Sequence, residues 1–166
     1  MSATKAAGER AIQLVGLILF IGTCLGVGAT GGAVTATSVE TWYPQLRKPS
    51  WTPPNWVFGP VWTTLYILMG TAAWLVWRKR KTERVSKPLI AFAVQLLLNL
   101  LWSVLFFGLR SPGAAFVGVL LLFTVLAATL AMFWRVNKLS GALLFPYLTW
   151  VSFAAVLNGA LWWMNR

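Results

Sequence analysis

The sequence predicts an all-α, polytopic membrane protein in which five transmembrane helices form a bundle. Hydrophobic residues make up 58% of the 166 residues and charged residues only 10%, whereas a soluble domain carries roughly 25% charged residues. The apolar residues gather into five runs, each long enough to cross a hydrocarbon core of about 30 Å as a helix. Strands would leave backbone groups unpaired in lipid, so the runs are predicted to be helices.

The runs follow one another with short connections, apart from one longer loop after the first run. The expected spans are residues 11–36, 57–77, 88–108, 114–134 and 140–163, within a single membrane domain covering residues 1–166. The first span carries two small-xxx-small pairs among Gly22, Gly26, Gly28 and Gly32, which permit a close helix approach. That contact could lie within the bundle or between protomers. Pro146 is expected to kink the fifth span.

The basic residues predict the orientation of the spans. Ten of the 14 Lys and Arg residues fall on the N-terminal segment and on the second and fourth connections, and the other four fall on the opposite side. The positive-inside rule then places the N-terminus in the cytoplasm and the C-terminus outside, with a bacterial cell membrane as the expected location. The net charge of +11 could suggest nucleic acid. Because the charges lie at the ends of apolar runs, they indicate membrane orientation, and no nucleic-acid partner is expected.

The loop at residues 37–56 is unusually rich in proline and tryptophan for a connection. Prolines limit its backbone freedom and the aromatic rings need an apolar surface to cover. We therefore expect a structured cap over the outer end of the bundle. The alternative is a segment that only rests among the lipid headgroups. The residues concerned are Trp42, Tyr43, Pro44, Pro49, Trp51, Pro53, Pro54 and Trp56.

The side chains available for chemistry are few. The chain has no His and one cysteine, Cys24, so a disulfide within the chain, a histidine-ligated haem, a zinc–histidine site and a histidine general base are excluded. No metal site is expected. No Lys, Arg, Asp or Glu lies well inside a span, although ion-coupled transporters usually keep such a group there. The absence of these ionisable side chains from the spans argues against a coupled pump and against ordinary acid–base catalysis.

Three of the 11 tryptophans lie at a depth that suggests a pocket. Trp62, Trp102 and Trp150 are on three different spans, and all are reachable from the side covered by the loop at 37–56. Neighbours at helical spacing share their faces: Tyr66 with Trp62, Asn99 with Trp102, and Ala154 and Asn158 with Trp150. Aromatic walls, neutral polar groups and a lid suit a flat, apolar ligand. The alternative is ordinary aromatic packing between helices.

Three stretches carry a resemblance to a known family. They are WYPQLRKPSWTPPNWVFGPVWTTLYILMG at 42–70, LNLLWSVLFFG at 98–108 and FPYLTWVSFAAVLN at 145–158. With the five-span plan, they resemble the translocator protein / tryptophan-rich sensory protein family, also written TspO/MBR and formerly called the peripheral benzodiazepine receptor family. The resemblance implies a five-helix bundle with a ligand cavity under the first loop. It also implies binding of porphyrins such as protoporphyrin IX, no obligatory cofactor, and a homodimer in the membrane lipid.

The resemblance also assigns roles to particular residues. The ligand-binding positions carried over are Tyr43, Pro53, Phe58, Trp62, Tyr66, Asn99, Trp102, Trp150 and Ala154. The family associates the positions of Trp62 and Trp150 with light-dependent porphyrin breakdown, which makes them candidate catalytic residues. The main expectation is a membrane receptor or sensor that regulates or transports porphyrins. The alternatives are a porphyrin-degrading enzyme and a sterol- or lipid-binding transport protein. Sterol binding is doubtful, because the C-terminal AAVLNGALWWMNR lacks the tyrosine of the animal cholesterol pattern.

Overall fold

The computed structural model describes residues 3–166, with side chains from Ala7 onward, and the regular secondary structure in this part of the chain is helical. Five helices are long and apolar enough to cross a membrane, which confirms the all-α, five-span prediction. They are α1 (Ala3–Thr41), α2 (Asn55–Arg78), α3 (Ser86–Ser103), α4 (Pro112–Val136) and α5 (Lys138–Met164). A 3₁₀ turn, η1 (Tyr43–Gln45), follows α1, and a π-helical turn, η2 (Val104–Gly108), extends α3.

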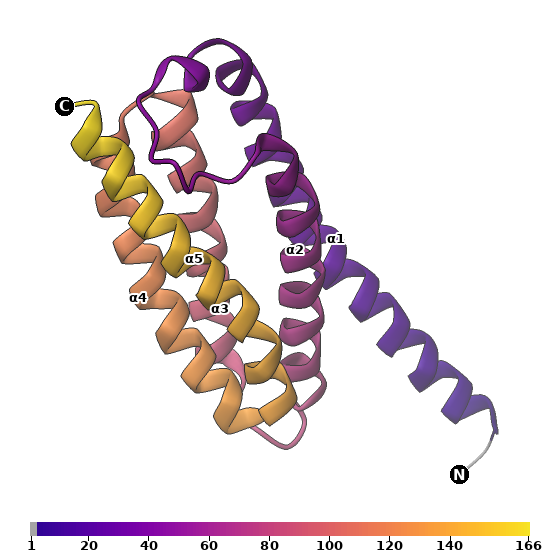
Figure 1. The fold of residues 1–166 in the computed structure, drawn as a ribbon. Coiled ribbons are helices and arrows are strands. Elements are labelled where there is room, and N and C mark those ends of the chain that lie inside the picture. Colours follow the sequence, from indigo (N-terminus) through magenta and orange to yellow (C-terminus); the bar gives the residue numbers. More distant parts are fainter. Residues whose placement is uncertain (1–2) are drawn as a thin grey trace.

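The five helices form one bundle, in which α4 packs against α3 and α5, and α2 packs against α1 and α5. The N- and C-termini lie at opposite ends (Figure 1). The segment 42–54 and the α3–α4 connection share the end that carries the C-terminus, as the odd number of spans requires. The basic segment between α2 and α3 lies at the other end.

Helix α1 runs to Thr41, five residues past the expected end of the first span. Residues 33–41 contain neither glycine nor proline, so nothing stops the helix before Pro44. The Ser38 hydroxyl donates to the Phe107 carbonyl oxygen at 2.6 Å, which fastens the extra turns to η2. The connection between α1 and α2 is therefore residues 42–54, shorter than the expected loop at 37–56.

Close contact between α1 and α2 depends on Gly70. A Cβ atom at this position would lie 2.6 Å from the Ile21 Cα atom, which is backbone and cannot turn away. The α1 glycines behave differently from one another. Gly28 lies against the Tyr66 ring, whereas Gly22, Gly26 and Gly32 have open space where a side chain would be. Of the two small-xxx-small pairs, only Gly28 serves packing within the described bundle.

The centre of the bundle holds a short chain of polar side chains. The Tyr66 hydroxyl donates to Asn99 Oδ1 at 2.6 Å, and Asn99 Nδ2 donates to the Tyr147 hydroxyl at 3.1 Å. All three side chains are buried. Because a buried polar group without a partner is costly, this chain joins α2, α3 and α5 in one register.

Candidate ligand-binding site

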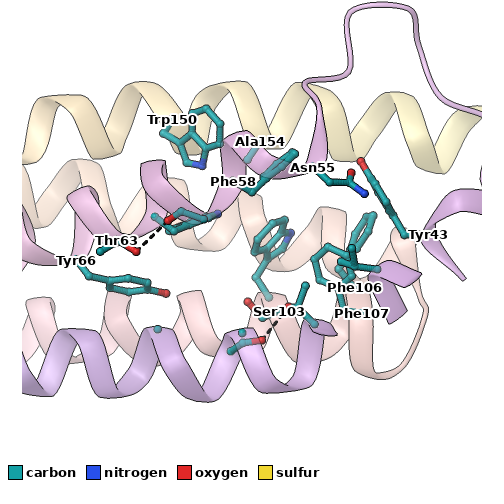
Figure 2. A pocket seen from close by; sticks show the side chains of 18 of the residues that line it. Tyr43, Asn55, Phe58, Thr63, Tyr66, Ser103, Phe106, Phe107, Trp150 and Ala154 are labelled. Carbon is teal, nitrogen blue, oxygen red and sulfur yellow. Dashed lines mark hydrogen bonds between the residues drawn. The ribbon is translucent and has the colours of Figure 1, made fainter. Parts of the chain in front are cut away.

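A cavity of about 490 Å³ lies beneath segment 42–54, between α1, α2, α3, η2 and α5. Its volume falls within the range of small-molecule sites. Figure 2 shows aromatic side chains from several elements converging on it. The residues that line it are mostly aromatic, aliphatic or glycine: Leu25, Gly28, Ala29, Gly31, Gly32, Thr35, Val39, Tyr43, Asn55, Phe58, Gly59, Trp62, Thr63, Tyr66, Trp102, Ser103, Phe106, Phe107, Trp150, Phe153, Ala154, Leu157, Asn158 and Leu161.

The three tryptophans selected from the sequence meet at this cavity. The Trp62 ring lies 6.2 Å from the Trp102 ring and 5.7 Å from the Tyr66 ring, centroid to centroid. Trp150 approaches from α5, with its ring 5.8 Å from that of Phe58. These rings surround a space instead of filling it, so the structure differs from simple aromatic packing between helices.

Seven of the nine residues proposed for ligand contact line the cavity: Tyr43, Phe58, Trp62, Tyr66, Trp102, Trp150 and Ala154. Asn99 does not line it. This residue is 1% exposed and holds the Tyr66 and Tyr147 hydroxyls below the cavity floor. Pro53 lies in segment 42–54 outside the lining. Asn99 and Pro53 are therefore not part of the cavity surface, and their contact with a ligand stays a prediction.

Segment 42–54 is a structured cap, tied to the C-terminal end of α5. The side-chain amide of Asn165 makes two hydrogen bonds with the backbone of Arg47. Arg47 N donates to Asn165 Oδ1 at 2.9 Å, and Asn165 Nδ2 donates to Arg47 O at 2.9 Å. The Trp51 ring meets the Phe153 ring at 5.9 Å. These contacts go beyond what a segment resting among lipid headgroups would need.

Tyr43 is the residue of the cap that reaches the cavity. Its ring lies 5.9 Å from the Phe107 ring, and Lys48 Nζ lies 4.7 Å from its ring centroid. Burial raises the pKa of the Tyr43 phenol, so the hydroxyl stays neutral in the physiological range. The cap thus closes the cavity with an uncharged, aromatic surface.

Few polar groups in the lining are free to bind a ligand. The Trp102 indole donates to Asn158 Oδ1 at 2.9 Å, and Asn158 Nδ2 donates in turn to Pro112 O. The Thr63 hydroxyl is occupied by the Gly59 carbonyl of its own helix. In contrast, Trp150 Nε1 is buried and has no hydrogen-bond partner within residues 3–166. A buried donor without a partner carries a desolvation cost that a ligand acceptor would remove.

The side of the cavity between α1 and α2 is walled by small residues. Ala29 and Gly32 on α1 and Gly59 and Thr63 on α2 line the cavity and are also exposed on the outer surface of the bundle. This side lies within the length of the apolar helices. A bilayer-dissolved ligand could therefore approach the cavity between these two helices without passing the cap.

Several residues that line the cavity were not predicted from the sequence. Phe106 and Phe107 are adjacent, so a regular helix would not be expected to bring both to one pocket, but both line it from η2. The π-helical turn is visible in the bond from Leu109 N to Val104 O at 2.8 Å. π-helical turns often mark functional sites. The two adjacent phenylalanines after Trp102 were the one sign in the sequence that this segment lines a cavity. Nothing in the sequence indicated that the glycines of α1 line it.

Comparison with known proteins decides the family. The sequence model described as the TspO/MBR family matches residues 20–164, which include all three of the stretches noted above and every residue that lines the cavity. The chain belongs to the TspO/MBR family. Family membership and five apolar helices together establish a multi-pass integral membrane protein.

Similar TspO/MBR proteins come from bacteria and animals. The chain is 45% identical over 157 residues to the tryptophan-rich protein TspO of Chlorobaculum tepidum, covering 92% of this chain and 98% of that protein. It is 46% identical over 127 residues to the translocator protein of Homo sapiens, covering 75% of each chain. It is 41% identical over 143 residues to the protein CrtK of Rhodobacter capsulatus, covering 86% of this chain and 88% of that one.

Proposed function

We propose that this protein is a membrane receptor that binds porphyrin-type tetrapyrroles, such as protoporphyrin IX, in the cavity beneath segment 42–54. The observation that carries the proposal is the enclosure of an apolar space by Trp62, Trp102 and Trp150, which come from three different helices. Flat ring systems gain dispersion and offset-stacking energy against indole faces. The sequence relatives named tryptophan-rich sensory protein and translocator protein support a role in sensing or transport.

The polar part of such a ligand has candidate partners on α5 and in the cap segment. The buried N–H of Trp150 has no hydrogen-bond partner within residues 3–166, and a carboxylate or carbonyl oxygen that reached it would supply one. Arg47 and Lys48 lie in the cap segment and could meet porphyrin carboxylates there. Since the wall between α1 and α2 is made of small residues, the ring could enter from the bilayer while its carboxylates stay near the cap.

The direct test is a porphyrin titration of the purified protein followed by the Soret absorption band. Trp62→Ala removes a wall of the cavity and should weaken protoporphyrin IX binding by about tenfold or more, since it loses both stacking and buried area. Trp163→Ala is the matched control, because that ring is 64% exposed and outside the lining. Equal affinities for the two variants would refute the proposal.

A second candidate is light-driven porphyrin breakdown, favoured by the position of Trp62 between two phenols. Its ring lies 5.7 Å from Tyr66 and 6.1 Å from Tyr147, a cluster of oxidisable rings. One electron would pass from an indole to the excited porphyrin, and dioxygen would take that electron from the porphyrin radical anion as superoxide. The indole radical cation would then take one electron back from the porphyrin, and superoxide would add to the resulting porphyrin radical cation, so that the net change is addition of dioxygen to the porphyrin with the indole restored. Illumination in air should then yield a product that depends on Trp62 or Trp150. Identical bleaching of free and bound porphyrin would remove this candidate.

Homodimerisation is part of the proposal. Gly22, Gly26 and Gly32 leave an open, small-residue face on α1, and helices in lipid associate through such faces. Cross-linking in membranes would detect the dimer.

A further inference from the structure

A second hollow lies at the end of the bundle opposite the cap. It is a groove of about 680 Å³ between the N-terminal part of α1 and the C-terminal end of α2, continuing onto the connection after α2. Figure 1 shows the N-terminal half of α1 leaning away from the other helices on this side. The groove shares no residue with the porphyrin cavity, so the proposed function does not account for it.

The rim of the groove is strongly basic. Arg10, Arg78, Arg80 and Lys81 line it, and Glu9 is the acidic residue among them. Two of the cations are positioned by aromatic rings: the Arg78 guanidinium carbon lies 4.7 Å from the Trp74 ring centroid, and that of Arg80 lies 3.4 Å from the Trp77 ring centroid. Guanidinium groups held in this way present N–H donors in a fork that fits phosphate oxygens.

The wall of the groove is apolar. Leu14 is 61% exposed and lines the groove together with Leu17, and the Trp74 ring forms the opposite side. The Trp74 indole donates to the Gln13 carbonyl oxygen at 2.9 Å, which keeps α1 and α2 at a fixed separation here. From the basic rim to Leu17 the groove follows α1 for about 10 Å at 1.5 Å per residue, a length suited to the first part of an acyl chain.

The geometry points to a binding site for an anionic phospholipid in this groove. The lipid phosphate would lie between the cations of α1 and α2, and an acyl chain would follow Leu14 and Leu17 along α1. Charge complementarity selects this occupant, since four cations face one carboxylate. A zwitterionic lipid brings its own cation to the rim, and free phosphate leaves the apolar wall uncovered. The site lies at a helix end, where headgroups of the bilayer are expected.

The test is native mass spectrometry of the detergent-purified protein with added phosphatidylglycerol or phosphatidylcholine. The test variant is Arg10→Gln/Arg78→Gln/Lys81→Gln. The matched control, Lys79→Gln/Arg84→Gln/Lys87→Gln, removes three charges from the same end of the bundle, outside the groove. The site predicts that phosphatidylglycerol retention falls by about tenfold or more in the test variant, given roughly fivefold per cation, and by less than about twofold in the control.

Three results would overturn the site. They are equal losses in the two triple variants, equal retention of phosphatidylcholine and phosphatidylglycerol by the unmodified protein, and displacement of the lipid by millimolar inorganic phosphate. Circular dichroism and the protoporphyrin IX titration report on folding, and neither depends on the groove. If the triple variant does not fold, Arg78→Gln against Arg84→Gln gives the same comparison with single substitutions, with about fivefold expected for Arg78→Gln alone.

Discussion

At the scale of single residues, position along a helix separates those that contact the cavity from those that support it. Trp62 and Tyr66 are one helical turn apart and both line the cavity, as the sequence spacing predicted. Asn99 and Trp102 are also at helical spacing, but only Trp102 reaches the cavity. Asn99 lies one turn further from the cap, and its amide is held by two tyrosine hydroxyls, so that Tyr66 reaches the cavity and Asn99 lies behind it.

Substitution of Asn99 should therefore change stability more than ligand affinity. Asn99→Leu leaves the hydroxyls of Tyr66 and Tyr147 buried without this partner, which costs about 1–3 kcal/mol. Thermal unfolding in detergent measures the loss. Replacing all three polar groups, as Tyr66→Phe/Asn99→Leu/Tyr147→Phe, should recover most of it, because no unpaired hydroxyl remains. A triple variant less stable than the single one would contradict this role.

At the scale of elements, the helices were predictable and their contacts were not. Each expected span lies within an observed helix, or within α3 together with η2, because apolar length alone requires a helix in lipid. The π-helical turn at η2 and the Ser38–Phe107 hydrogen bond that holds the last turns of α1 against it are features that apolar length alone does not predict. The rotation of α1 about its own axis also decides which of its glycines pack against a neighbouring helix, and the spacing of the glycines in the sequence does not determine that rotation.

The contact between α1 and α2 makes a specific prediction about two glycines. Gly70→Ala places a methyl group against the Ile21 backbone and should force the two helices apart, with clear destabilisation. Gly8→Ala meets open space, lies outside the proposed dimer face, and should be neutral or stabilising by up to about 1 kcal/mol through helix propensity. Thermal unfolding of both variants in the same detergent gives the comparison. Equal stability of the two would mean that α1 does not approach α2 at Gly70.

At the scale of the whole molecule, the two ends of the bundle carry different groups, and the odd number of spans places the two termini at opposite ends. One end carries the cap, the C-terminus and the cavity beneath the cap, and the other carries the basic connection after α2 and the groove. This two-ended plan follows from the sequence, since span count and charge placement require no side-chain detail. The cavity itself could be proposed from three tryptophans, but its walls on α1 and η2 required the structure.

The orientation of this plan in the membrane is testable with fusions. The charge bias predicts a cytoplasmic N-terminus, so green fluorescent protein fused there should fluoresce in a bacterial host. Alkaline phosphatase fused after Arg166 should be active, because that enzyme folds only outside the cytoplasm. The reverse pattern would place the cap and the cavity on the cytoplasmic side.

The proposed function depends most on the cavity being the place where the ligand binds. Ala154 is 9% exposed and lines it, whereas Val156, on the same helix, is 64% exposed and faces outward. Ala154→Phe fills the cavity and leaves every tryptophan in place; Val156→Phe adds a ring to the outer surface of the same helix. The decisive measurement is the protoporphyrin IX affinity of these two variants. We predict a loss of about tenfold or more for Ala154→Phe, from lost stacking and burial, and no change for Val156→Phe. Unchanged affinity in Ala154→Phe would contradict porphyrin binding in this cavity.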